Sequence, residues 1–129
     1  MKHFTLLAFF VLLGSIQVPG TVLAQDGAMR VGDQPYDEEA LAALPGQSFV
    51  FYDDGEALFG DDGAYSYTYS AANGGGTAWG SYRVAQDGQV CVTFVNGMSR
   101  CDQYVTNRDR TVVITSEGQR FPVRSSQIP

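Results

Sequence analysis

Short turn signals, repeated along most of this chain, constrain its fold more than any other feature. After Gly46, an acidic residue or asparagine is followed by glycine at six places: Asp54-Gly55, Asp62-Gly63, Asn73-Gly74, Asp87-Gly88, Asn96-Gly97 and Glu117-Gly118. Such dipeptides favour tight turns because these residues tolerate positive φ. The runs between them are rich in Val, Phe, Tyr and Thr, and they predict strands near 48–52, 56–59, 64–70, 77–85, 89–95, 98–105, 110–116 and 119–124.

Evenly spaced short strands with short connections predict an all-β fold in which each strand pairs with the next. We expect a small antiparallel meander, barrel-like or sandwich, of about seven to eight short strands with one short N-terminal helix. The domain organisation expected is a single β domain with its leading helix over 36–124, a loose N-terminal arm over 25–35 and a frayed tail over 125–129. The apolar faces of the alternating strands are expected to form one core. Pro122, in the last strand, is expected at an edge or a strand end.

The one good helix candidate is the segment YDEEALAAL at 36–44. Asp37, Glu38 and Glu39 suit the start of a helix, where the helix dipole favours negative charge, and Pro45 ends it. We interpret this acidic cluster as dipole complementation, with a site for a cation or a basic partner as the alternative.

The first 24 residues have the pattern of a cleaved secretory signal peptide. Lys2 precedes an apolar run, helix breakers follow, and Val22-Leu23-Ala24 offers small or branched residues before a cut after Ala24. The alternative, an uncleaved membrane anchor, fits less well because a spanning helix needs about 20 apolar residues. We therefore expect a periplasmic or secreted protein, without membrane insertion of the mature chain.

Charge and composition exclude several functions once the leader is removed. The remaining chain has no Lys and no His, and its formal charge is −7. Imidazole catalysis, a lysine Schiff base and a histidine-ligated metal are thereby excluded, and an acidic chain argues against nucleic-acid binding. Six of the arginines lie in the second half of the chain: Arg83, Arg100, Arg108, Arg110, Arg120 and Arg124. We interpret them as parts of solvated sheet faces, with an anionic-ligand site as the alternative.

The only two cysteines, Cys91 and Cys101, are expected to form a disulfide in an oxidising compartment. A three-residue loop of Val95-Asn96-Gly97 would set them directly opposite one another on neighbouring strands. A redox-active pair is the alternative, but the spacing is not that of a C-x-x-C motif.

The segment GGGTAWGSYRVAQDGQVCVTFVNGMSRC at 74–101 resembles small exported β-rich proteins of alphaproteobacteria. These combine a Gly-rich turn, a strand with Trp, a DG-x-x-C hairpin and a second Cys, often after a DG-x-Y segment such as Asp62-Gly63-Ala64-Tyr65. The resemblance covers residues 46–124. It implies the compartment and a β-rich fold; the group has no assigned function, so it implies no activity.

Catalytic and metal sites are not predicted. A nucleophilic serine motif is missing, and the carboxylates that could act in a small hydrolase, kept as a residual hypothesis, show no pairing in their spacing: Glu56, Asp102, Asp109 and Glu117. The acidic segments 53–56 and 61–63 are interpreted as turns, because neither has the ligand pattern of a calcium loop. We expect no cofactor and no metal.

Aromatic side chains are the most suggestive feature. Tyr65, Tyr67 and Tyr69 alternate along one strand, and Trp79 and Tyr82 lie on the next, with Phe49 and Phe51 before them. Such rings suit a sugar face, a flat apolar ligand or a protein partner, but they also fill the cores of small β domains. The candidate binding residues are Tyr65, Tyr67, Tyr69, Trp79 and Tyr82.

Two functions from different classes follow. The first is an exported, non-catalytic binding or accessory module for an unidentified small ligand. The alternative is an acidic protein-interaction module, such as an inhibitor of a basic envelope hydrolase, whose charge would steer the encounter. A closed aromatic-lined cavity would favour the first, and a filled core with a protruding loop near 71–76 would favour the second.

The mature protein should begin at Gln25. The intact mass of protein from its native host measures this directly. A soluble species that retains Met1 would contradict the predicted export.

Overall fold

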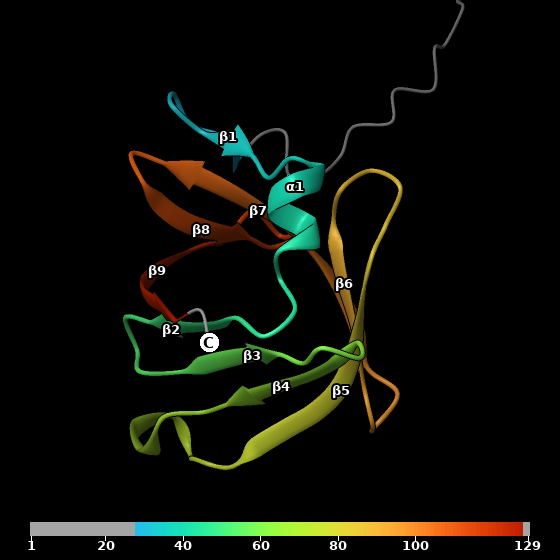
Figure 1. The fold of residues 1–129 in the computed structure, drawn as a ribbon. Coiled ribbons are helices and arrows are strands. Elements are labelled where there is room, and N and C mark those ends of the chain that lie inside the picture. Colours follow the sequence, from blue (N-terminus) through green and yellow to red (C-terminus); the bar gives the residue numbers. More distant parts are fainter. Residues whose placement is uncertain (1–27, 128–129) are drawn as a thin grey trace, which may run out of the picture.

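The structure, a computed structural model, describes residues 28–127, so the predicted signal peptide, residues 25–27 of the arm and the last two residues of the tail lie outside it. Within this part of the chain, eight antiparallel strands follow one another as a meander that closes into a barrel (Figure 1). Their bounds are β2 (Ser48–Phe51), β3 (Glu56–Phe59), β4 (Ala64–Thr68), β5 (Thr77–Val84), β6 (Val90–Phe94), β7 (Ser99–Asn107), β8 (Arg110–Ile114) and β9 (Arg120–Gln127). The predicted all-β meander is confirmed, in its barrel form.

Pairing between the first and last barrel strands closes the sheet. β2 pairs with β9 from Ser48 opposite Gln127 to Phe51 opposite Val123. β9 therefore runs to Gln127, and the prediction of a frayed tail is wrong for residues 125–127. β9 pairs with β8 as far as Pro122 and with β2 from Val123 onward. Pro122 thus lies where the strand changes partner, which is where a missing N–H is tolerated, and not at an edge of the sheet.

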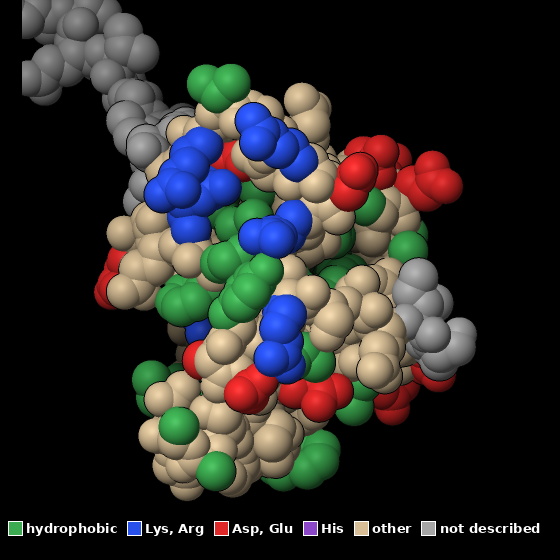
Figure 2. Space-filling view, turned by 90° about the vertical axis from the view of Figure 1, so that its left-hand side faces the viewer, with side chains coloured by type: hydrophobic (Ala, Val, Ile, Leu, Met, Phe, Trp, Pro, Cys, Tyr) green, Lys and Arg blue, Asp and Glu red, His purple; other side chains and the backbone are tan. Residues whose placement is uncertain are grey.

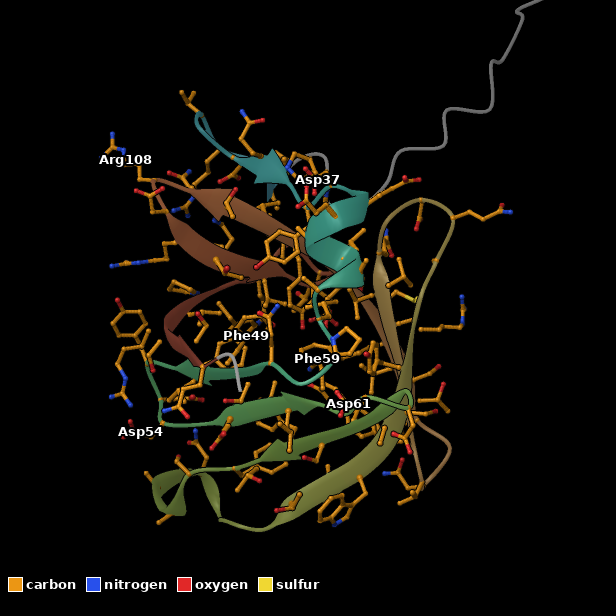
Figure 3. The ribbon with its side chains drawn as sticks, viewed as in Figure 1. Asp37, Phe49, Asp54, Phe59, Asp61 and Arg108 are labelled. Atoms are coloured by element: carbon orange, nitrogen blue, oxygen red, sulfur yellow. A yellow bond between two sulfur atoms is a disulfide. The ribbon has the colours of Figure 1, made fainter. Side chains whose placement is uncertain are left out.

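Aromatic rings fill most of the barrel lumen. Phe59 is fully buried and contacts Phe49, Tyr65, Tyr82 and Tyr104, with ring centroids 4.9–6.1 Å apart. Phe49 and Phe59 lie between the strands in the middle of the molecule (Figure 3). An eight-stranded barrel is just wide enough for side chains to fill its interior, so this chain, poor in Leu and Ile, uses rings for volume.

Helix α1 (Glu38–Ala42) packs against the lumen core and is shorter than the predicted 36–44. Asp37 is its N-cap, and the Asp37 carboxylate accepts a hydrogen bond from the Ala40 N–H at 2.8 Å. The helix ends at Ala42 because Pro45 disfavours helical geometry in the residue before it. Leu41 and Leu44 are both buried in the core.

The N-terminal arm is ordered from residue 28, which corrects the expectation of a loose segment. Strand β1 (Gln34–Pro35) pairs with β7, outside the closed barrel. Ala28 and Met29 pack on a second apolar cluster formed by Val105, Val112 and Ile114. Alternation along β8 sends Val113 into the lumen and Val112 and Ile114 outward, so the chain has two apolar clusters instead of the single core expected.

A buried ion pair fixes the arm to the barrel. Arg120 donates two hydrogen bonds to the Asp33 carboxylate, at 2.7 and 2.9 Å, and a third to the Ala28 carbonyl at 2.9 Å. Asn107 and the Arg30 N–H also donate to Asp33. The Arg120 hydrogen bonds hold the pKa of Asp33 well below its usual range, against the opposing effect of burial.

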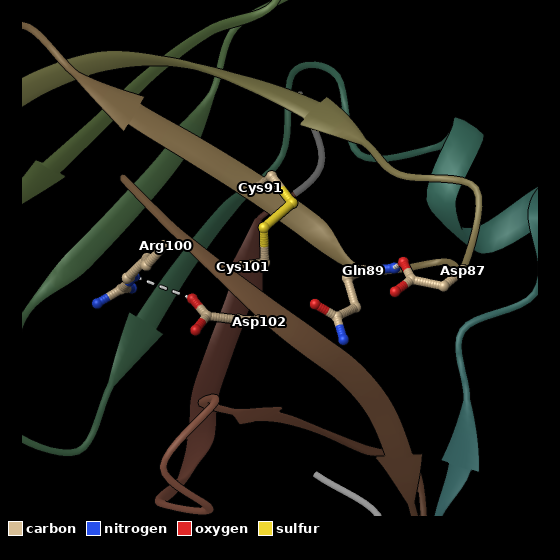
Figure 4. Close-up of a disulfide and its surroundings, with 6 residues drawn as sticks. All are labelled: Asp87, Gln89, Cys91, Arg100, Cys101 and Asp102. Atoms are coloured by element: carbon tan, nitrogen blue, oxygen red, sulfur yellow. Dashed lines mark hydrogen bonds and ion pairs between the residues drawn. A yellow bond between two sulfur atoms is a disulfide. The ribbon is translucent and has the colours of Figure 1, made fainter. Parts of the chain in front are cut away.

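The predicted disulfide is present. Cys91 and Cys101 are register partners, their Cα atoms are 4.0 Å apart, and the bond lies on the outer wall between β6 and β7 (Figure 4). The turn has the predicted three residues: the Phe94 N–H donates to the Met98 carbonyl at 2.8 Å, and Gly97 has a φ of 87°.

Replacing Asp33 with Asn should lower the free energy of unfolding at pH 7 by about 3 kcal/mol, because Arg120 then stays buried without a counter-charge. Asp33 has a depressed pKa, so its contribution is present above the unfolded pKa and is lost as the pH falls. The difference from the wild type should therefore shrink below about pH 4.

The exposed pair Arg124–Asp54, at 2.8 Å, offers a matched control. Urea titrations of the wild type and both variants measure the two effects. Asp54→Asn should change the free energy of unfolding by less than about 1 kcal/mol, since exposed ion pairs contribute little. Equal losses in the two variants would contradict a special role for Asp33.

Candidate functional site

One end of the barrel is open and lined by aromatic rings. A cavity of about 130 Å³, here called the mouth pocket, is bordered by side chains from six barrel strands and two connections between strands: Phe51, Asp53, Tyr67, Tyr69, Phe94, Arg100, Val113 and Phe121. In a meander the turns alternate between the two ends of the barrel, and most of these residues lie near the β2–β3, β4–β5, β6–β7 and β8–β9 turns. The mouth pocket is therefore the unfilled end of the lumen, with Phe51 and Val113 as its buried floor.

Alternation on β4 brings two of the predicted tyrosines to this pocket. Tyr65, Tyr67 and Tyr69 all lie on the inward face. The rings of Tyr67 and Tyr69 meet edge to face, with their centroids 4.9 Å apart. Tyr67 also packs on Phe51, at 6.1 Å. Gly55 lies so close to the Tyr67 hydroxyl that a Cβ there would be 2.1 Å from it, so any side chain at this position would displace the tyrosine.

Strand β7 supplies the positive charge at the mouth pocket. Arg100 and Asp102 both face the lumen, and the Arg100 Nε lies 2.9 Å from the Asp102 Oδ2 (Figure 4). The Asp102 side chain is buried, whereas that of Arg100 is 46% exposed and borders the pocket. Asp102 Oδ1 has no hydrogen-bond partner among the described residues. A half-exposed guanidinium above apolar walls can receive an oxygen acceptor.

Burial dominates the electrostatics below the pocket. It raises the pKa of Tyr65 to about 12, with Arg100 acting in the opposite direction. It also raises the pKa of Asp102 above its usual value, despite the attraction of Arg100. Burial and then the Asp53 charge raise the pKa of Tyr67. These phenols are neutral hydrogen-bonding groups at neutral pH.

The structure separates the five candidate binding residues into three groups. Tyr67 and Tyr69 line the mouth pocket, and Tyr65 is buried beneath it, 6.0 Å from Phe94. Tyr82 is on the next strand, where its hydroxyl donates to the Gly60 carbonyl and its ring packs on Phe59. Trp79 is on the outer wall and is 61% exposed, so it does not join the others.

Six pocket residues were not among the candidate binding residues. Phe51 was noted only as a neighbour, Asp53 was interpreted as part of a turn, and Arg100 was interpreted as part of a solvated sheet face with an anionic-ligand site as the alternative. The other three were read as parts of strands: Phe94, Val113 and Phe121. Their faces follow from alternation, but their convergence depends on barrel closure. The segment 71–76 lies at the rim of the pocket, where Asn73 donates to Asp53 at 3.1 Å. The mouth pocket is thus an open cup beside the exposed segment 71–76, and not the closed aromatic-lined cavity set out above as favouring a ligand.

The acidic turns behave as turn chemistry predicts. The carboxylates of Asp53, Asp62 and Asp87 each accept the backbone N–H of the residue two positions later. Of the four carboxylates considered for hydrolysis, Asp102 alone is buried. Within residues 28–127, no group of three or more His, Cys, Asp or Glu side chains is arranged to hold a metal ion.

Comparison of the chain with protein-family models, with curated proteins and with solved structures finds no match. No helix in the described residues is long and apolar enough to cross a membrane.

Tyr65→Phe should remove a phenol that ionises near pH 12 in the folded protein. The folded pKa lies above the unfolded value, so the Tyr65 contribution is present below about pH 10 and is lost as the pH rises towards 12. A tyrosinate absorbance titration of the wild type and the variant measures the ionisation of Tyr65. Between pH 7 and pH 11, the free energy of unfolding should fall less in the variant than in the wild type. Loss of a step near pH 10 would show that Tyr65 is exposed.

Proposed function

We propose that this protein is an exported, non-catalytic binding module that holds the flat apolar end of a small ligand in the mouth pocket. The observation that carries the proposal is the convergence of five aromatic rings and one guanidinium at the open end of the barrel: Phe51, Tyr67, Tyr69, Phe94, Phe121 and Arg100. Ligand sites are concave and mostly apolar, with a few polar groups that fix orientation. The open mouth of a small barrel is a common place for such a site.

The size of the pocket limits the ligand class. Its 130 Å³ is close to the roughly 150 Å³ of a protein cavity that admits benzene. One ring or a short apolar chain end fits, and the remainder of the ligand would lie outside, along the rim. Edge-to-face contacts with Tyr67 and Tyr69 favour a ring over an aliphatic chain.

Arg100 would orient the ligand, because it favours an end that carries an oxygen acceptor. Its ion pair with Asp102 uses Nε, and the half-exposed side chain borders the pocket. Asp53, the other charged group on the rim, already accepts hydrogen bonds from Gly55 and Asn73. A ring that carries a carboxylate or another oxygen acceptor would satisfy Arg100 while the ring is desolvated.

A protein partner is the second candidate, in line with an acidic inhibitor of a basic envelope hydrolase. The observation that favours it is the exposed segment 71–76. Its three glycines have positive φ, and no atom lies within 4 Å of the position that a Cβ would take at any of them. A partner could insert one apolar side chain into the mouth pocket and contact this segment, with Asp53 and Asp54 on the β2–β3 turn and Glu56 at the start of β3.

The test is a fragment titration followed by NMR, with benzoate and benzyl alcohol as ring probes and hexanoate as an aliphatic one. Benzoate should shift the resonances of Phe94 and Val113 at millimolar concentration. Tyr69→Ala should weaken benzoate binding at least about tenfold, because it removes one wall of the pocket. The Tyr69 side chain is half-exposed, so the variant should keep its fold. Trp79→Ala, on the outer wall, is the matched control and should leave binding unchanged.

The charge preference has its own variant. Arg100→Gln combined with Asp102→Asn removes both members of the ion pair, so neither charge is left buried alone. This variant should bind benzoate no better than benzyl alcohol. If no probe shifts the pocket resonances of the wild type, the small-ligand proposal fails, and capture of a basic hydrolase by wild type but not by a variant with a shortened 71–76 segment would support the partner instead.

A further inference from the structure

A second concave site lies on the outer wall, and it is basic although the chain as a whole is acidic. A groove of about 550 Å³ is lined by four arginines around an apolar floor, and we call it the basic groove: Arg30, Asn107, Arg108, Arg110, Val112, Arg120 and Pro122. Figure 2, which faces the side of the molecule where Arg108 lies, shows the arginines gathered around hydrophobic side chains. The groove shares no lining residue with the mouth pocket.

Three of these arginines carry charge that no described acid balances. Arg120 is neutralised by the buried Asp33, whose oxygens are also engaged by Asn107 and the Arg30 N–H. Among residues 28–127, Arg30, Arg108 and Arg110 make no ion pair; Arg110 lies 5.4 Å from the centre of the Tyr52 ring. Asp109 and Arg124 are outside the groove lining, on a neighbouring shallow depression. The groove therefore has three available guanidinium charges.

The turn that presents Arg108 adopts a backbone conformation unusual for its sequence. Arg108 and Asp109 form the two-residue loop between β7 and β8, with φ of 50° and 66°. Loops of this kind favour Asn-Gly, because other side chains are strained at positive φ. A charged, strained residue at the rim of a concave site is the arrangement expected where the side chain serves binding rather than folding.

The overall negative charge does not prevent an anion from binding here. At physiological salt the Debye length is about 8 Å, so distant acids are largely screened and the local guanidinium groups dominate. Guanidinium forks pair with phosphate oxygens through two hydrogen bonds each. Three such groups converging on one groove match a ligand that carries several phosphate charges better than they match a single carboxylate.

We infer that the basic groove binds a phosphate ester with at least two negative charges, and that Arg30, Arg108 and Arg110 contact its oxygens. The inference is independent of the proposed function of the mouth pocket. The apolar floor of Val112 and Pro122 supports the non-phosphate part of the ligand. The Asp33 carboxylate, held by Arg120, also accepts the Arg30 N–H and so keeps the arm that carries Arg30 at the groove. The ester could be a soluble phosphorylated metabolite or the headgroup of an anionic lipid; both present the same chemistry.

Calorimetric titration with inorganic pyrophosphate in phosphate-free buffer at low salt tests the site. The wild type should bind, and the affinity should fall steeply with added salt. Arg108→Asn combined with Arg110→Gln should weaken binding by about a hundredfold, roughly tenfold for each lost charge-assisted contact. Asn suits the positive φ of residue 108, so this variant should keep its fold, which its melting temperature reports.

Arg83→Gln, on the outer face of β5, is a control for the loss of positive charge and should leave pyrophosphate binding unchanged. Sedimentation with vesicles containing phosphatidic acid separates the two sources. Binding to these vesicles that pyrophosphate reverses indicates a lipid headgroup, and binding of pyrophosphate alone indicates a soluble ester. The inference is overturned if the wild type binds neither probe, or if Arg83→Gln weakens binding as much as the groove variant does.

Discussion

Closure of the sheet by the β2–β9 pair is the constraint on which the rest of this structure depends. It leaves the lumen without an edge strand and fixes its diameter, so the inward residues of eight strands must fill a space of set width. Rings do this here, with Phe59 at the centre of four aromatic contacts. Filling stops before one end, where the partly exposed Arg100, Tyr69 and Phe121 border the pocket. The mouth pocket is the part of the lumen that this packing leaves open.

The outer wall is organised by a different interaction. On β7 and β8, Val105, Val112 and Ile114 face away from the lumen, and a bare apolar surface of this kind would be exposed without a cover. Residues 28–35 supply it, and the bidentate Asp33–Arg120 contact holds them in position. The same contact orients Arg120 and holds the backbone of Arg30 at the basic groove. The arm is thus part of the folded domain and part of a candidate site.

Local chemistry made the strands and the disulfide predictable. Each Asp-Gly or Asn-Gly turn is decided by two residues, and the register of Cys91 with Cys101 follows from one loop length. Properties set by distant residues were not accessible in this way. Alternation indicated that Tyr65, Tyr67 and Tyr69 share a face, but which face of β5 is inward depends on closure, and Trp79 lies on the outside. The loose arm and frayed tail were wrong for residues 28–35 and 125–127, because both segments pair with strands far away in sequence.

Strands β8 and β9 contribute to both candidate sites through alternate residues. Val113 and Phe121 border the mouth pocket, whereas the adjacent Val112 and Pro122 form the floor of the basic groove. A register slip of one residue on β9 would exchange inward and outward side chains and damage both sites together. Two interactions oppose such a slip: the pairing of β9 with β2 beyond Pro122, and the Arg120 contact with Asp33. The β2–β9 pairing that closes the barrel and the Asp33–Arg120 ion pair that holds the arm therefore act on the same strand, and the geometry of each site depends on both.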